Sequence, residues 1–76
     1  MNLVFDIETD GLDASKIFCI SALDVDTQEQ KNFDINNISN GIAYLMQAEK
    51  LIGHNIIGFD IPVIKNLYRV DLSDKK

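Results

Sequence analysis

Two carboxylates lie two residues apart near the start of the chain, at Asp6 and Glu8. They end an apolar run, and Gly11 breaks the pattern soon after them. In a β-strand alternate side chains point to the same face, so these two would lie side by side. Carboxylates held that close repel each other unless a cation lies between them, and hard oxygen ligands suit Mg²⁺ or Mn²⁺. The pair is therefore a candidate metal site, although two polar residues at the solvated end of a strand would give the same pattern.

The net charge limits the kinds of partner that the chain attracts. Its 76 residues carry a formal charge of −5, whereas proteins that bind nucleic acid usually present a basic face. A metal-dependent nuclease is the exception, because divalent ions in an acidic cluster supply the positive charge that meets the phosphate. The acidic balance therefore makes nucleic-acid binding less expected without excluding a nuclease.

Cys19 is the only cysteine, and it lies within the apolar run at residues 17–20. Such a thiol is typically a small buried side chain rather than a reactive group. A single cysteine allows no disulfide framework, which fits the reducing cytoplasm. The apolar runs are short, and no basic segment followed by an apolar core begins the chain. We therefore expect neither secretion nor a membrane-spanning segment.

Three strands are expected in the first half of the chain. Residues 2–7 are apolar at nearly every position, which suggests burial on both faces and a central place in the sheet. After a turn at Asp10 and Gly11, residues 16–25 form the second strand. A polar hairpin turn leads to the third strand at residues 30–35. These strands form an antiparallel meander.

Two helices and a short strand are expected in the second half. Asn36 and Asn37 supply helix-capping chemistry, and apolar residues at helical spacing predict a helix over residues 38–49. Residues 51–54 are too few for a second helix directly after the first and indicate a brief strand. After a turn, a last helix covers residues 59–68, with Pro62 in its first turn.

The order βββαβα predicts one α/β domain over residues 1–76. Its mixed sheet has the order 3-2-1-4, with the fourth strand parallel to the first through a right-handed connection. The polar tail at residues 70–76 is expected to fray. Because the carboxyl ends of the first and fourth strands are neighbours, we expect Asp60, in the opening turn of the last helix, near Asp6 and Glu8.

Two segments carry a resemblance to a known family. Residues 4–12 (VFDIETDGL) resemble the first exonuclease motif of the DEDD, or DnaQ-like, 3′–5′ exonucleases, and residues 54–62 (HNIIGFDIP) resemble the second. The likeness is strongest to the N-terminal proofreading domain of phage-type family A DNA polymerases and covers nearly the whole chain. It implies an RNase H-like fold, a role in DNA replication, and hydrolysis from the 3′ end of single-stranded DNA in a bacterial or phage-infected cytoplasm.

The resemblance also implies roles for individual residues. Asp6, Glu8 and Asp60 match the catalytic acids that hold two Mg²⁺ or Mn²⁺ ions. Asp6 would bridge the ions, Glu8 would also lie near the attacking water, and Asp60 would hold the outer metal. Such a site stabilises the attacking and the leaving oxygen of a phosphoryl transfer.

Four further residues match positions that contact the substrate in the family. Thr9 and Leu12 correspond to contacts with the terminal nucleotide, Leu12 as an apolar wedge at the last base. Asn55 and Phe59 flank the acid of the second motif, and Phe59 is equally suited to the core. His54 is more simply a structural histidine at the end of the fourth strand than a catalytic base.

The chain departs from the family pattern after the second motif. The third motif, an aspartate preceded by a tyrosine or histidine on a later helix, has no counterpart in the polar tail, and the fifth strand and later helices are missing as well. The fourth strand is then an exposed edge that can pair with another chain. We therefore expect a partial domain, inactive alone, whose partner is the remainder of a polymerase or exonuclease, or a second copy.

Two other hypotheses remain open on the sequence. The chain could be a self-standing, non-catalytic module that keeps the exonuclease fold and contacts nucleic acid or a polymerase. It could also be an acidic α/β domain whose likeness to the two motifs arises by chance. The sequence that surrounds the chain in its genome would separate a polymerase fragment from a free-standing module.

Overall fold

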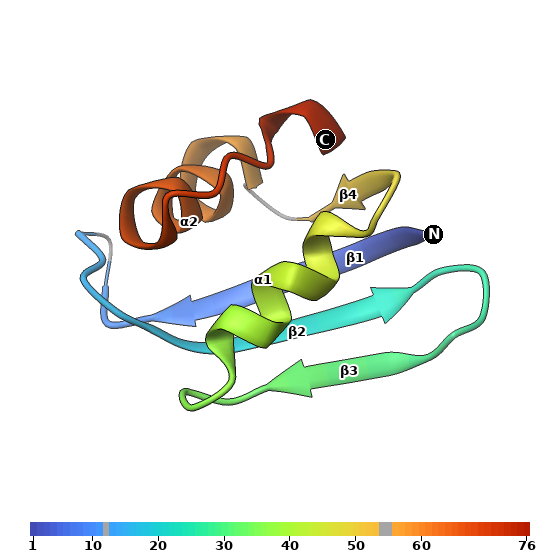
Figure 1. Cartoon of the computed structure of the whole chain (residues 1–76), viewed down its shortest axis with the longest axis horizontal. Helices are drawn as coiled ribbons and strands as arrows, with labels where there is room; N and C mark the ends of the chain where they lie inside the picture. The colour runs from blue at the N-terminus through green and yellow to red at the C-terminus, as the bar shows by residue number, and fades with distance from the viewer. Residues whose placement is uncertain (12, 54–55) are drawn as a thin grey trace.

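The computed structural model describes residues 1–11, 13–53 and 56–76, in which one sheet is covered by two helices (Figure 1). The strands are β1 (Asn2–Thr9), β2 (Ile17–Asp24), β3 (Gln30–Phe33) and β4 (Lys50–Ile52). The helical segments are α1 (Ile38–Met46), the π-helical turn η1 (Ile56–Asp60), α2 (Ile61–Tyr68) and the 3₁₀ turn η2 (Ser73–Lys75). Within these ranges, the structure contains no helix with the length and apolar character that crossing a membrane requires.

The strands form one mixed sheet in the order β3-β2-β1-β4. β1 is antiparallel to β2 and parallel to β4, and β2 is antiparallel to β3. This order and the βββαβα succession agree with the prediction, so the α/β fold class is confirmed. β4 lies at the edge of the sheet as described. Pairing of that edge with another chain stays a prediction.

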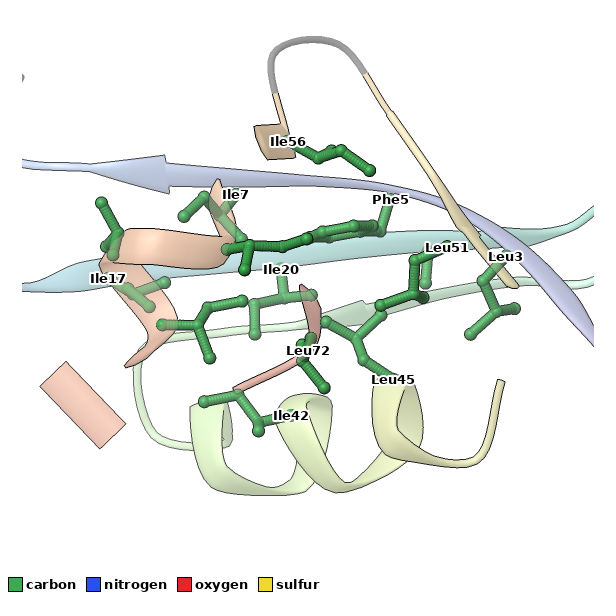
Figure 2. Close-up of a cluster of buried hydrophobic side chains, with 14 of the residues drawn as sticks. Leu3, Phe5, Ile7, Ile17, Ile20, Ile42, Leu45, Leu51, Ile56 and Leu72 are labelled. Carbon is green, nitrogen blue, oxygen red and sulfur yellow. The ribbon is translucent and has the colours of Figure 1, made fainter. Parts of the chain in front are cut away.

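One face of the sheet is buried and the other is open to solvent. Burial alternates along β1, where the buried side chains are Leu3, Phe5 and Ile7 and the exposed ones are Val4, Asp6 and Glu8. The expected burial of both faces is therefore wrong, since even Val4 is 37% exposed. The reason is that α1 and α2 contribute to the same hydrophobic cluster as the buried side chains of β1, so both helices cover one face (Figure 2).

The helix starts differ in detail from the expected ones. Asn37 is the N-cap of α1, but its side chain makes no capping bond to the helix; its Nδ2 instead donates to Asp34 Oδ1 at 2.8 Å. The last helix, α2, begins at Ile61, two residues after the expected start, and the π-helical turn η1 leads directly into it. Pro62 lies in the first turn of α2, as predicted. The π-helical turn thus extends from the expected turn into the first two residues of the expected helix.

The end of α1 comes at Met46, three residues before the expected one. The amide of Ala48 donates to the carbonyl of Leu45 at 3.1 Å, which tightens the last turn. The amide of Glu49 then donates to the carbonyl of Met1 at 2.8 Å. The chain has therefore left the helix by residue 49, directly before β4 begins at Lys50.

The last residues of the chain pack against the core. Leu72 is 1% exposed and lies near Ile42 and Leu45 of α1 (Figure 2). The Nζ of Lys75 donates to the carbonyl oxygen of Ala48 at 3.0 Å. The hydrophobic cluster thus includes Leu72, with Val70 packed against it, and the expected fraying of residues 70–76 stays a prediction.

A glycine lets α1 approach the sheet closely. A Cβ atom added at Gly41 would lie 2.9 Å from Cγ of Phe33 and 3.1 Å from Cδ1 of Ile20. The ring of Phe33 also packs against Tyr44, with the two centroids 5.8 Å apart. The missing side chain at position 41 therefore sets the distance between α1 and the strands β2 and β3.

We predict that Gly41→Ala lowers the free energy of unfolding by about 1 kcal/mol, although alanine is the better helix former. Overpacking costs roughly 1–3 kcal/mol and the gain in helix propensity returns roughly 1 kcal/mol. Urea denaturation followed by circular dichroism measures the change. Ala43→Gly, at an exposed position of α1, reports the propensity effect alone. Adding Phe33→Leu to Gly41→Ala should recover part of the loss, and a stabilised Gly41→Ala would contradict the close packing.

Candidate functional site

Asp6 and Glu8 lie on the open face of the sheet. Both side chains are exposed, and the register places Asp6 opposite Ser21 and Glu8 opposite Cys19 of β2. A shallow cavity of about 190 Å³ lies on the sheet at Asp6, Ser21 and Gln30. Strand periodicity therefore brings the two carboxylates to one side of β1, in reach of solvent and of a ligand.

Asp60 has a different environment from the first two acids. It is the last residue of η1 and only 4% exposed, whereas Asp6 and Glu8 are exposed. A search of the described residues finds no group of three or more Asp, Glu, His or Cys side chains that could hold a metal ion. The structure thus places two of the three predicted acids on the same face of the sheet. The role of Asp60 as a metal ligand stays a prediction.

The exposed pair is chemically suited to a divalent metal. Asp6 and Glu8 offer hard oxygen atoms, and Mg²⁺ is commonly held by one or two carboxylates together with water and substrate phosphates. In a site of this kind water and the substrate supply the remaining ligands, so Asp6 and Glu8 are candidate donors from the protein. The pair therefore fits Mg²⁺ or Mn²⁺.

Gly53 lets the chain pass close to β1 beside the candidate acids. A Cβ atom at this position would lie 2.7 Å from the carbonyl oxygen of Phe5, the residue before Asp6, and would also overlap the side chain of Ile56. A backbone atom cannot move aside as a side chain can, so the position requires glycine. The signal for this close approach is present in the sequence, although we did not use it: a glycine lies between the short apolar strand and the segment that carries Asp60.

Asp10 organises the loop that follows the acidic end of β1. Its Oδ1 accepts hydrogen bonds from the amides of Ser15 at 2.9 Å and Lys16 at 3.2 Å, and its Oδ2 accepts one from the Ser15 hydroxyl. The Ser15 hydroxyl, followed by the Ser15 amide, lowers the pKa of Asp10 below its ordinary value. Asp10 therefore holds together the loop between β1 and β2. From the sequence it was predicted only to be part of a turn.

The structure describes two of the four residues that were expected to contact substrate. The hydroxyl of Thr9 donates to the carbonyl of Gly11 at 2.9 Å, and Phe59 is half-buried against the hydrophobic core. Leu12 and Asn55, together with His54, lie outside the described residues. The predicted substrate contacts therefore stay predictions.

The Cys19 thiol is half-buried rather than fully buried. It lies opposite Glu8 in the β1–β2 register, and its Sγ is 3.9 Å from the hydroxyl of Ser21. It thus belongs to the open face of the sheet, beside the candidate acids, because its strand neighbour Ile20 takes the buried side.

Comparison with known proteins gives a family for the chain. The sequence profile of the RNase H superfamily matches residues 3–76, which include Asp6, Glu8 and Asp60. No curated protein matches the chain at a significant level. The match extends over both segments whose carboxylates were expected to act together, and over the sheet and both helices that carry them.

We predict that Asp10→Asn lowers the melting temperature at pH 7 and that its difference from the wild type shrinks as the pH falls below about 4. The pKa of Asp10 is lowered in the folded chain. Its stabilisation is therefore complete above the unfolded-state pKa of about 3.9 and is lost as the pH falls through the folded-state pKa.

Melting curves recorded by circular dichroism at several pH values test this. Asp13→Asn, which changes an exposed aspartate of the same loop, is the control. Equal melting temperatures for Asp10→Asn and Asp13→Asn at pH 7 would show that the hydrogen bonds of Asp10 contribute nothing to stability.

Proposed function

The chain belongs to the RNase H superfamily, and we propose that it is the first part of a metal-dependent 3′–5′ exonuclease domain that acts on single-stranded DNA. The observation that carries the proposal is the exposure of Asp6 and Glu8 on one side of β1, where a ligand can reach both carboxylates. The likeness of residues 4–12 and 54–62 to the first two motifs of the DEDD exonucleases supports the reaction type. It also supports a proofreading role beside a phage-like DNA polymerase.

Asp6 and Glu8 would bind Mg²⁺ or Mn²⁺, with Asp60 as a further acid from the second motif. When bound, the metal supplies a more acidic water and neutralises charge that develops on the phosphate. By the resemblance to the exonuclease family, Glu8 would also lie near that water, and its side chain is exposed. Thr9 and Phe59 are placed on the two segments that carry these acids, which suits contacts with the terminal nucleotide.

We expect the isolated chain to be nearly inactive. Among the described residues no third His, Cys, Asp or Glu side chain is grouped with Asp6 and Glu8 so that the three could hold a metal ion. A positioned general base contributes roughly 10²–10⁴ in rate, and a residue of that kind belongs to the third motif of the resembling family. A further segment, in the same chain or in a partner, would therefore be needed for efficient hydrolysis.

A non-catalytic module is the second candidate. Asp60 is buried, whereas Asp6 and Glu8 are exposed. This difference favours the alternative, because a protein that only binds its partner does not need converging acids. Such a module would keep the fold and contact nucleic acid or a polymerase. Activity after completion of the domain separates the two candidates.

We predict that residues 1–76 alone leave a 5′-labelled, single-stranded oligonucleotide intact in Mn²⁺, and that the oligonucleotide shortens from its 3′ end once a third-motif segment is supplied by fusion or in trans. Denaturing gel electrophoresis follows the products. An oligonucleotide with a phosphorothioate in its last linkage should resist, which gives the direction of attack.

Variants of the completed domain assign the activity to the proposed acids. Asp6→Asn should remove cleavage, whereas Asp26→Asn, which changes an exposed acid in the β2–β3 turn, should retain it. No cleavage after completion would favour the non-catalytic module. Robust cleavage by residues 1–76 alone, lost in Asp6→Asn, would contradict the need for a further segment.

A further inference from the structure

The basic side chains of this acidic protein are concentrated near its C-terminal end. Residues 61–76 contain four of the seven Lys and Arg residues but only two of the twelve Asp and Glu residues. Residues 1–60 contain the other ten acids and three lysines. Phosphate groups are attracted to clustered cations even when the net charge of a protein is negative. Helix α2 and the tail are therefore where a polyanion meets the least repulsion.

A groove lies between α2 and the tail. It has a volume of about 330 Å³, and its polar lining includes Lys65 and Asn66 from the second turn of α2 and Ser73 and Lys76 from the tail. The packing of Leu72 into the core holds the tail against the helix, which forms the groove. Two cations, the carboxylate of Asp71 and two neutral hydrogen-bonding side chains thus border one concave surface.

The apolar side of the groove joins it to the candidate acids. Ile61 and Pro62, in the first turn of α2, also line the groove, and Ile61 directly follows Asp60. A sugar or a base can pack against an apolar wall while its phosphate contacts the cations. The groove therefore begins at the same end of α2 as the carboxylate of the second motif.

An internal ion pair keeps one of the lysines near the groove. The Nζ of Lys65 is 3.7 Å from Oδ2 of Asp71, and both side chains are at least half exposed. Oδ1 of Asp71 accepts the amide of Ser73 at 2.9 Å, so the carboxylate is held by the backbone of the tail. Exposed ion pairs contribute little to stability, so Lys65 can turn from Asp71 to a phosphate at small cost.

We propose that this groove, bordered by Lys65, Asn66, Ser73 and Lys76, binds a backbone phosphate of single-stranded DNA. Lys65 and Lys76 supply the charge, and the Asn66 amide and the Ser73 hydroxyl supply hydrogen-bond donors. Asp71 opposes the phosphate and so limits its affinity. The choice of DNA as the polymer rests on the proposed function, whereas binding of a phosphate polymer rests on the groove itself.

Fluorescence anisotropy with a 5′-labelled oligothymidylate, recorded in EDTA at several salt concentrations, tests this proposal. The double variant Lys65→Gln/Lys76→Gln should bind at least several-fold more weakly than the wild type. Each phosphate contact to a single strand contributes about 0.7 to the slope of log K against log salt, so the slope should fall by about 1.4. Asp71→Asn should bind more tightly than the wild type, because it removes the competing anion.

Lys31→Gln is the matched control, since it removes one positive charge from β3, at the edge of the sheet opposite to β4. It should bind like the wild type, because it lies outside the groove. Melting curves of every variant confirm folding. The lysines in the groove are not required for packing, since the Lys65 side chain is 62% exposed.

Three outcomes would overturn the proposal. The first is equal affinity and salt slope for the double variant and Lys31→Gln. The second is unchanged or weaker binding by Asp71→Asn. The third is that inorganic phosphate shifts the NMR signals of the backbone amides at the groove while the oligonucleotide does not bind. The groove would then be a site for small anions only. None of these outcomes depends on the exonuclease reaction, so the groove can fail while the proposed function stands, and the reverse.

Discussion

The position of the two exposed carboxylates depends on the burial of a single face of the sheet. Leu3, Phe5 and Ile7 are hidden beneath the helices, and the period of two along a strand then directs Asp6 and Glu8 to the opposite face. Burying each large apolar side chain contributes roughly 1.5–3 kcal/mol, whereas burying an ion without a partner costs several kcal/mol. A shift of β1 by one residue would exchange the two faces and lose both advantages. The hydrophobic core thus fixes the orientation of the candidate metal ligands.

The second half of the chain approaches this strand through close backbone contact. Gly53 allows the segment after β4 to pass beside the carbonyl of Phe5, and the π-helical turn that follows ends at the buried Asp60. The tail then returns over α1 and is fixed by Leu72, which forms the groove beside α2. One core therefore supports two separate surfaces: an acidic open face suited to a metal, and a more basic groove suited to phosphate.

Local pattern was sufficient to predict the elements and their order, because turn residues, apolar periodicity and the handedness of the crossover each limit the possible arrangements. It was insufficient where a contact between residues distant in sequence decides whether a side chain is buried. Val4 is apolar like its neighbours, so nothing local indicates that it lies on an open face. Leu72 lies in a tail that is polar apart from Val70, and its burial depends on α1, which is distant in sequence. The paired placement of Asp6 and Glu8 followed from strand geometry, whereas the burial of Asp60 depends on a π-helical turn that no periodicity predicts.

The central claim is that Asp6 and Glu8 together form the metal-binding surface of this fold. Paramagnetic broadening tests it most directly, by titrating Mn²⁺ into the ¹⁵N-labelled protein and following each backbone amide in two-dimensional NMR spectra. We expect early, selective broadening of the amides of β1 around Asp6 and Glu8 and of the paired residues Ser21 and Cys19, and loss of that pattern in Asp6→Asn. Uniform weak broadening over all acidic segments, or selective broadening elsewhere while the amides of β1 stay sharp, would contradict it.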